Sequence, residues 1–158
     1  PRHIHRLSAV ESLLDELAFP YQLHSKGAEL DPQTRVYVVD TMGDLMYFYG
    51  VCESAFVGGS LVDVGGHNPM EPGSLGKPMM MGPYRRNISD IAELFADQGA
   101  MVLVEGVTDV LTFWQGTENS ARKQVMSEAA LTVMEANRGA LQKVIHDLSN
   151  DLGLSTLE

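Results

Sequence analysis

The part of the sequence most suited to chemistry is the segment of residues 58–78, which reads GGSLVDVGGHNPMEPGSLGKP. It holds two pairs of glycines, and glycine lets a backbone approach a bound molecule closely. Asn68 followed by Pro69 is typical of a helix cap and the first helical position. Such a helix start would offer free amides and a positive dipole end to a phosphate, and Glu71 in the first turn could accept hydrogen bonds from sugar hydroxyls. A glycine-rich turn with no ligand remains the alternative, because such motifs are common in loops.

Other polar residues give weaker indications. His3 and His5 form an H-x-H pair that could bind a metal. No third ligand has a suitable spacing and the chain has no Asp-x-Asp pair, so we expect no metal site and no cofactor. Arg85-Arg86 is interpreted as a solvated pair, with an electrostatic role toward a ligand or an anionic membrane as the alternative. His24 and His146 show no partners in the sequence pattern.

The elements that would position these residues follow from the apolar pattern. Helical spacing and continuous apolar runs predict helices and strands in alternation, with only helices beyond residue 107. The predicted helices cover residues 7–19, 45–51 and 88–96 and two further segments separated at 137–139, and the predicted strands cover residues 21–24, 36–39, 55–57, 78–81 and 100–104.

This alternation predicts an α/β fold, a Rossmann-like parallel sheet with helices on both faces that ends in helices. In such a sheet, ligands bind beyond the carboxyl ends of the strands. The rule selects four loops, at residues 1–6, 41–44, 58–71 and 82–87.

Composition narrows the function further. With 158 residues, 44% of them hydrophobic, the chain can bury a core, and we expect one domain over residues 1–158. The net charge of −10 disfavours nucleic-acid binding. The single cysteine, Cys52, is expected to pack in the core of a soluble, reduced domain. Because the sequence opens on Pro1 without a methionine, we expect the natural protein to extend further at its N-terminus.

The run GGSLVDVGGHNPMEPGSLGKPMMMGP, followed by Asn87, resembles the signature of the Kdo transferases, where Kdo is 3-deoxy-D-manno-octulosonic acid. Residues 42–45 (MGDL) resemble the MGEL of that family, and residues 1–6 (PRHIHR) resemble its PRHxxR. Asn137-Arg138-Gly139-Ala140 matches its NRGA. The chain departs from the family pattern at Ile4, His5, Asp44, Met70, Gly73 and Tyr84.

The resemblance implies the C-terminal half of a glycosyltransferase-B fold, which binds the donor CMP-Kdo. A lipid A precursor would be the acceptor, bound by an N-terminal domain that also supplies a glutamate as general base. The chain alone is then expected to hold no catalytic residue and to be inactive. Its expected location is the cytoplasmic face of the bacterial inner membrane, in lipopolysaccharide biosynthesis.

The resemblance also implies which residues contact the nucleotide. They fall on three of the strand-end loops and comprise Pro1, Arg2, Met42, Gly43, Asp44, Asn68, Pro69, Met70 and Glu71, with Gly65, Gly66 and His67 as a supporting loop. Two alternatives remain at this stage. One is another nucleotide-sugar transferase or a UDP-dependent epimerase of the same fold, and the other is a non-catalytic flavodoxin-like module.

Overall fold

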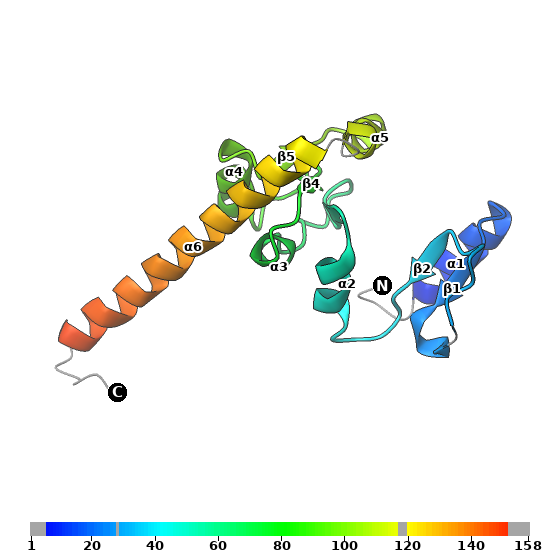
Figure 1. Ribbon diagram of the computed structural model, residues 1–158, viewed down its shortest axis with the longest axis horizontal. Coiled ribbons are helices and arrows are strands. Elements are labelled where there is room, and N and C mark those ends of the chain that lie inside the picture. The colour runs from blue at the N-terminus through cyan, green and yellow to red at the C-terminus, as the bar shows by residue number, and fades with distance from the viewer. Residues whose placement is uncertain (1–5, 28, 117–119, 152–158) are drawn as a thin grey trace. The chain divides into compact units, whose positions relative to one another are not determined.

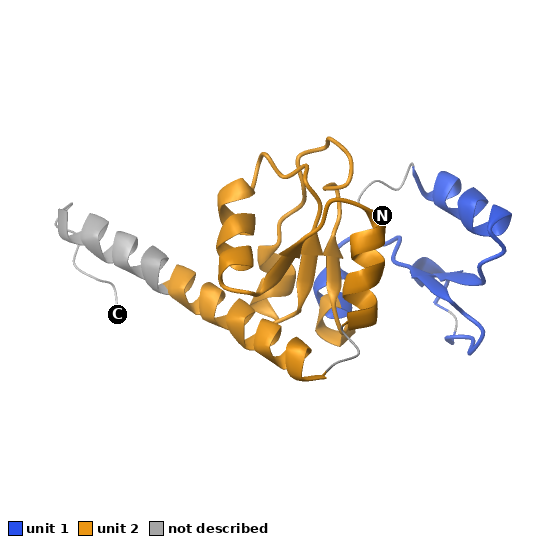
Figure 2. Cartoon of the chain, turned by 90° about the horizontal axis from the view of Figure 1, so that it is seen from above, with its two compact units in different colours: residues 1–48 blue, residues 49–158 orange. Residues whose placement is uncertain are grey.

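The computed structural model describes residues 6–27, 29–116 and 120–151, with side chains described as far as Arg138. The chain divides into two compact units, residues 1–48 and residues 49–158 (Figure 2). The expectation that residues 1–158 form one donor-binding domain stays a prediction.

The first unit contains a pair of parallel strands. Strand β1 pairs with β2 so that Tyr21 lies opposite Val36 and Leu23 opposite Val38. Both strands confirm the sequence prediction to within one residue. The elements of this unit are α1 (Leu7–Glu16), β1 (Tyr21–Leu23), the short 3-10 helix η2 (His24–Lys26) and β2 (Val36–Val38), and helix α2 (Leu45–Val51) crosses into the second unit.

Helix α1 ends at Glu16, three residues earlier than predicted. The reason is Ala18, which takes a left-handed φ of 52°. Its amide donates to the Asp15 carbonyl at 3.1 Å, and the Phe19 amide donates to the Leu14 carbonyl at 2.9 Å. These two bonds close the helix in the way a glycine usually does. The stop was hidden in the sequence because alanine is a strong helix former.

The second unit contains a three-stranded parallel sheet in the order β3-β4-β5. The five strands therefore form two sheets, one in each unit, where the sequence had suggested a single sheet. Parallel pairing itself is confirmed in both. The elements of this unit are β3 (Ala55–Val57), α3 (Met70–Ser74), β4 (Met79–Met81), α4 (Ser89–Asp97), β5 (Met101–Leu103), α5 (Val107–Gly116) and α6 (Ser120–Asp151). All of them except β3 are labelled in Figure 1.

Helices cover both faces of this sheet, as predicted. The central strand β4 is fully buried, and its side chains alternate between two apolar clusters. Met79 and Met81 pack with α4 and α6, through residues such as Phe95 and Ala130. Met80 faces the other way and packs with α5 and the beginning of α6, through Phe113 and Met126. The consecutive apolar run is thus the pattern of a strand buried on both faces.

The prediction that two helices are separated at residues 137–139 is wrong, because α6 runs without a break from Ser120 to Asp151. The side-chain amide of Asn137 donates to the Val133 carbonyl one turn earlier, at 2.8 Å, so this residue is satisfied inside the helix. A single glycine costs a helix only about 1 kcal/mol. The buried stripe of Met126, Ala130 and Val133 provides the packing that offsets it.

Candidate functional site

The glycine-rich loop after β3 is closed at its base by two backbone hydrogen bonds. The Gly66 amide donates to the Gly59 carbonyl at 2.8 Å, and the His67 amide donates to the Gly58 carbonyl at 3.0 Å. Gly58 and Gly59 therefore pair with His67 and Gly66 as the two rungs of a short ladder. The His67 ring lies against Gly59, where an added Cβ would be 3.1 Å from its Nε2. This closed loop (residues 58–67) holds the three predicted supporting residues, Gly65, Gly66 and His67.

At Gly65 the backbone conformation strongly favours glycine. The residue has a φ of +91°, which side chains rarely tolerate. An added Cβ would also lie 2.4 Å from Nδ2 of Asn87, which belongs to the loop after β4. Asn87 and the closed loop thus approach each other at the carboxyl ends of adjacent strands, where parallel sheets bind their ligands.

Ser60 joins these two loops, and it is fully buried. Its hydroxyl donates to the Val57 carbonyl at 2.6 Å and accepts from the Gly82 amide at 3.0 Å. Its own carbonyl accepts from the Tyr84 amide at 2.9 Å. Sequence reasoning did not single out Ser60, although a serine directly after two glycines at a strand end was an available signal.

The start of α3 differs from the expected row of free amides. Oδ1 of Asn68 accepts from the Met70 amide at 3.0 Å, but the residue that precedes the helix is Pro69, one position later than the predicted cap. Pro69 has helical dihedrals (φ −80°, ψ −9°) although the helix itself begins at Met70. Pro69 and Pro72 have no amide hydrogen, and the Gly73 amide donates to the Pro69 carbonyl. Within the described residues, only the Glu71 amide of this turn remains without an acceptor.

Glu71 presents an exposed carboxylate on this turn. Its neighbours Pro72 and Gly73 are buried, and an added Cβ at Gly73 would lie 2.6 Å from the Phe95 ring. In the described part of the chain, the Glu71 carboxylate accepts no hydrogen bond and forms no ion pair. Burial raises the pKa of the Tyr49 hydroxyl, and the charge of Glu71 raises it further. Glu71 is therefore held by its backbone with its carboxylate free.

Lys77 has a structural role that the sequence did not reveal. Its Nζ donates to the carbonyls of Gly50 and Cys52, both at 2.9 Å, at the carboxyl end of α2. A cation at that end of a helix satisfies carbonyls that have no partner inside the helix. Cys52 is half-buried, and burial raises the pKa of its thiol while the charge of Lys77 acts in the opposite direction.

The loop after β4 bears the Arg85-Arg86 pair. Arg86 forms an ion pair with Asp63 at 2.8 Å, and both side chains are exposed. Arg85 is half-buried, which differs from the solvated pair expected, and its Nε is buried without a partner. Its Nη1 donates to the Gly82 and Pro83 carbonyls at 3.4 Å each. An open pocket of about 400 Å³ lies here, lined by Asp63, residues 83–86, Ser89 and Glu93.

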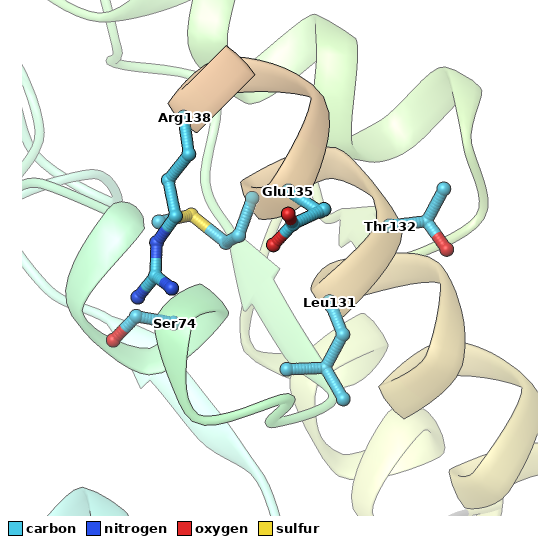
Figure 3. A pocket seen from close by; sticks show the side chains of 6 residues that line it. Ser74, Leu131, Thr132, Glu135 and Arg138 are labelled. Atoms are coloured by element: carbon cyan, nitrogen blue, oxygen red, sulfur yellow. The ribbon is translucent and has the colours of Figure 1, made fainter. Parts of the chain in front are cut away.

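A second pocket, of about 330 Å³, lies between the end of α3 and helix α6. Figure 3 shows Arg138 extending toward Ser74 across it, with Leu131 and Glu135 on the same side of α6. None of the predicted nucleotide-binding residues lines this pocket.

In the first unit, the loop between β2 and α2 contains the predicted contacts Met42, Gly43 and Asp44. Met42 is 71% exposed. The Asp44 carboxylate accepts from the Thr41 hydroxyl and lies 3.7 Å from Nε2 of His24. His24 therefore has partners after all, and the expectation that it had none is wrong. The pattern could not show this, because the partners come from three separate segments.

The predicted site residues are thus distributed as follows. Residues 65–71 lie together on the closed loop and the start of α3, and residues 42–44 lie together in the first unit. Pro1 and Arg2, like His3 and His5, lie outside the described residues. Over residues 6–27, 29–116 and 120–151, no group of three or more histidine, cysteine or acidic side chains could hold a metal ion. No helix in those ranges is long and apolar enough to cross a membrane.

The sequence and the fold were compared with those of known proteins. No protein-family model matches the chain. It is 34% identical over 147 residues to the 3-deoxy-D-manno-octulosonic acid transferase of Haemophilus influenzae, covering 92% of this chain and 34% of that protein. It is 32% identical over 155 residues to the enzyme of the same name from Bordetella pertussis, covering 97% of this chain and 36% of that protein. The chain thus spans about a third of the length of these relatives.

A solved structure is also similar. The crystal structure of the C-terminal CMP-Kdo binding domain of WaaA from Acinetobacter baumannii superposes with a TM-score of 0.79 at 32% identity. The match covers 85% of this chain and 70% of that one. This match identifies the parallel strands, covering helices and glycine-rich loop as the C-terminal half of a glycosyltransferase-B fold. The chain belongs to the Kdo transferase family and corresponds to its C-terminal domain.

Proposed function

We propose that this chain binds CMP-Kdo and serves as the donor-binding half of a Kdo transferase. The observation that carries the proposal is the similarity to the CMP-Kdo binding domain of the Acinetobacter protein, at 32% identity over most of the chain. The closed loop follows the carboxyl end of β3, and Asn87, which lies against Gly65, is in the loop after β4, so both are at the edge where ligands of parallel sheets bind.

The proposed nucleotide contacts are Pro1, Arg2, residues 42–44 and residues 68–71. Glu71 is the residue best suited to the ribose, because its carboxylate is exposed, has no partner among the described residues, and can accept from both hydroxyls. One free amide and a five-residue helix give α3 little capacity to hold a phosphate. The phosphate of the donor therefore depends on cations from outside this turn, with Arg2 as the candidate from the family motif.

Titration calorimetry with CMP, UMP and AMP tests this donor specificity. We expect CMP to bind and UMP to bind at least tenfold more weakly, since a site that hydrogen-bonds one base leaves polar groups unpaired with another. A preference for UMP would instead support the alternative of a UDP-sugar transferase or epimerase. Absence of binding by all three would overturn the proposal and support a module that binds no nucleotide.

We further propose that the complete reaction moves Kdo from CMP-Kdo to a lipid A precursor in lipopolysaccharide biosynthesis. The acceptor and the general base would belong to an N-terminal domain, and the reaction would occur at the cytoplasmic face of the inner membrane. The 158-residue chain should then form no product with CMP-Kdo and a lipid A precursor. Product formation by chain purified free of any other transferase would contradict this division of labour.

A further inference from the structure

The loop that carries Met42 and Gly43 is fixed at both of its ends by one short turn, η2. At the first end, the Asp40 carboxylate accepts from the Ser25 amide at 2.8 Å and from the Ser25 hydroxyl at 2.6 Å. At the second end, His24 lies 3.7 Å from the Asp44 carboxylate. Consecutive residues of η2 therefore hold the two aspartates that flank the loop.

His24 is itself fixed in orientation by aromatic neighbours. Its Nδ1 lies 3.1 Å from the Tyr37 hydroxyl on β2. Its ring meets the Phe48 ring edge to face, with 5.2 Å between the centroids, and the Tyr37 ring is 5.8 Å away. Such ring pairs have preferred geometries, so the imidazole is held from the strand and from helix α2.

The two ring nitrogens of His24 face different partners. Nε2 faces the Asp44 carboxylate, which can only accept, and Nδ1 lies within hydrogen-bond distance of the Tyr37 hydroxyl, which can donate or accept. Asp44 also accepts from the Thr41 hydroxyl, so its carboxylate is already engaged within the first unit.

We infer that His24 is a positioning residue, which orders the Met42–Gly43 backbone for nucleotide binding by anchoring Asp44. This inference rests on the proposed function. The Asp44 carboxylate then acts as an anchor, and residues 42–44 contact the nucleotide through their backbone. The aspartate that replaces the family's glutamate at this position is consistent with that role, because its carboxylate reaches its partners inside the unit.

Two substitutions of His24 distinguish the contribution of its ring packing from that of its ring nitrogens. His24→Phe keeps a ring against Phe48 and Tyr37 but removes both nitrogens. His24→Gln keeps one acceptor and one donor in place of the ring. Lys26→Gln, in the same turn, changes a charge without touching the anchor and serves as the control. The measurements are CMP affinity by calorimetry, the melting temperature, and backbone ¹⁵N order parameters of Met42 and Gly43 in the free protein.

We expect His24→Phe to lower the order parameters of Met42 and Gly43 and to weaken CMP binding about five- to tenfold, because a smaller fraction of molecules holds the loop ready to bind. His24→Gln should restore most of the affinity, and the control should match the wild type. A melting temperature close to that of the wild type in His24→Phe separates positioning from a general loss of structure.

Three results would overturn the inference. Unchanged order parameters in His24→Phe would show that His24 does not order the loop. Lower order parameters with unchanged CMP affinity would show that loop order does not contribute to binding. A loss of affinity that follows a large drop in melting temperature, with no rescue by His24→Gln, would indicate a purely structural role. If the wild type bound no CMP, the proposed function would fail, while the order parameters would still decide whether His24 anchors the loop.

Discussion

Removing the Glu71 carboxylate should weaken nucleotide binding and leave folding nearly unchanged. The side chain is exposed and, in the described part of the chain, accepts no hydrogen bond, so its loss leaves no buried group without a partner. Exposed substitutions of this kind change stability by about 0.5 kcal/mol or less. A charged hydrogen bond to a ribose hydroxyl contributes about 1.5–3 kcal/mol, so Glu71→Ala should raise the Kd for CMP roughly ten- to a hundredfold.

The assay compares CMP with 2′,3′-dideoxy-CMP on the wild type, on Glu71→Ala and on the control Glu93→Ala. Glu93 is an exposed glutamate on α4, outside the proposed nucleotide contacts. If Glu71 binds the ribose, the substitution should matter much less for the dideoxy ligand, because the hydroxyls that it binds are already absent. Equal losses for the two ligands would refute the ribose contact. A change seen only in stability would assign Glu71 to the helix dipole instead, an effect of about 0.3–1 kcal/mol.

Three further outcomes are expected. Ser60→Ala should lower the free energy of unfolding in urea by about 1–3 kcal/mol, since the Val57 carbonyl and the Gly82 amide lose their buried partner. A decrease no greater than that of the control Ser89→Ala would contradict this role. CMP affinity should be the same in chelator and in magnesium, and a collapse in chelator that magnesium reverses would show a metal-dependent site. The hydrogen bonds from the Ser25 hydroxyl and amide lower the pKa of Asp40 in the folded chain. The ionised carboxylate therefore stabilises the fold at pH values above its unfolded pKa of about 3.9. This stabilisation is lost as the pH falls through the lower, folded pKa. Unfolding measured between pH 5 and pH 2 should therefore depend less on pH in Ser25→Ala, and an identical profile would count against this coupling.

Much of the fold could be predicted because local pattern and tertiary packing agree. The run Met79–Met81 is apolar at every position, and the structure buries it on both faces of a sheet. The sequence misled where a residue took an uncommon role. Ala18 in a left-handed conformation ends α1, and Gly139 does not interrupt α6, since packing elsewhere on that helix outweighs its low propensity.

In the candidate site, too, local interactions could be predicted from the sequence and long-range contacts could not. The start of α3 could be predicted to within one residue, because the hydrogen bond from the Met70 amide to the Asn68 side chain is a local interaction. The roles of Ser60, Lys77 and His24 could not be found in the same way, because each depends on partners between 13 and 27 residues away that only the folded chain brings near. The number of free amides at α3 was also overestimated, although two prolines in its first turn were visible in the sequence.

The ladder at the base of the closed loop makes its tip a permissive place for inserted sequence. Val62 and Val64 are 64% and 60% exposed, and the two hydrogen bonds at Gly58 and Gly59 separate them from the sheet. Once a loop is closed at its base, doubling its length costs only about 0.6 kcal/mol of entropy. A peptide epitope or a fluorophore-binding tag inserted between these valines would therefore be exposed at the surface of the domain. The strands β3 and β4 would keep their pairing.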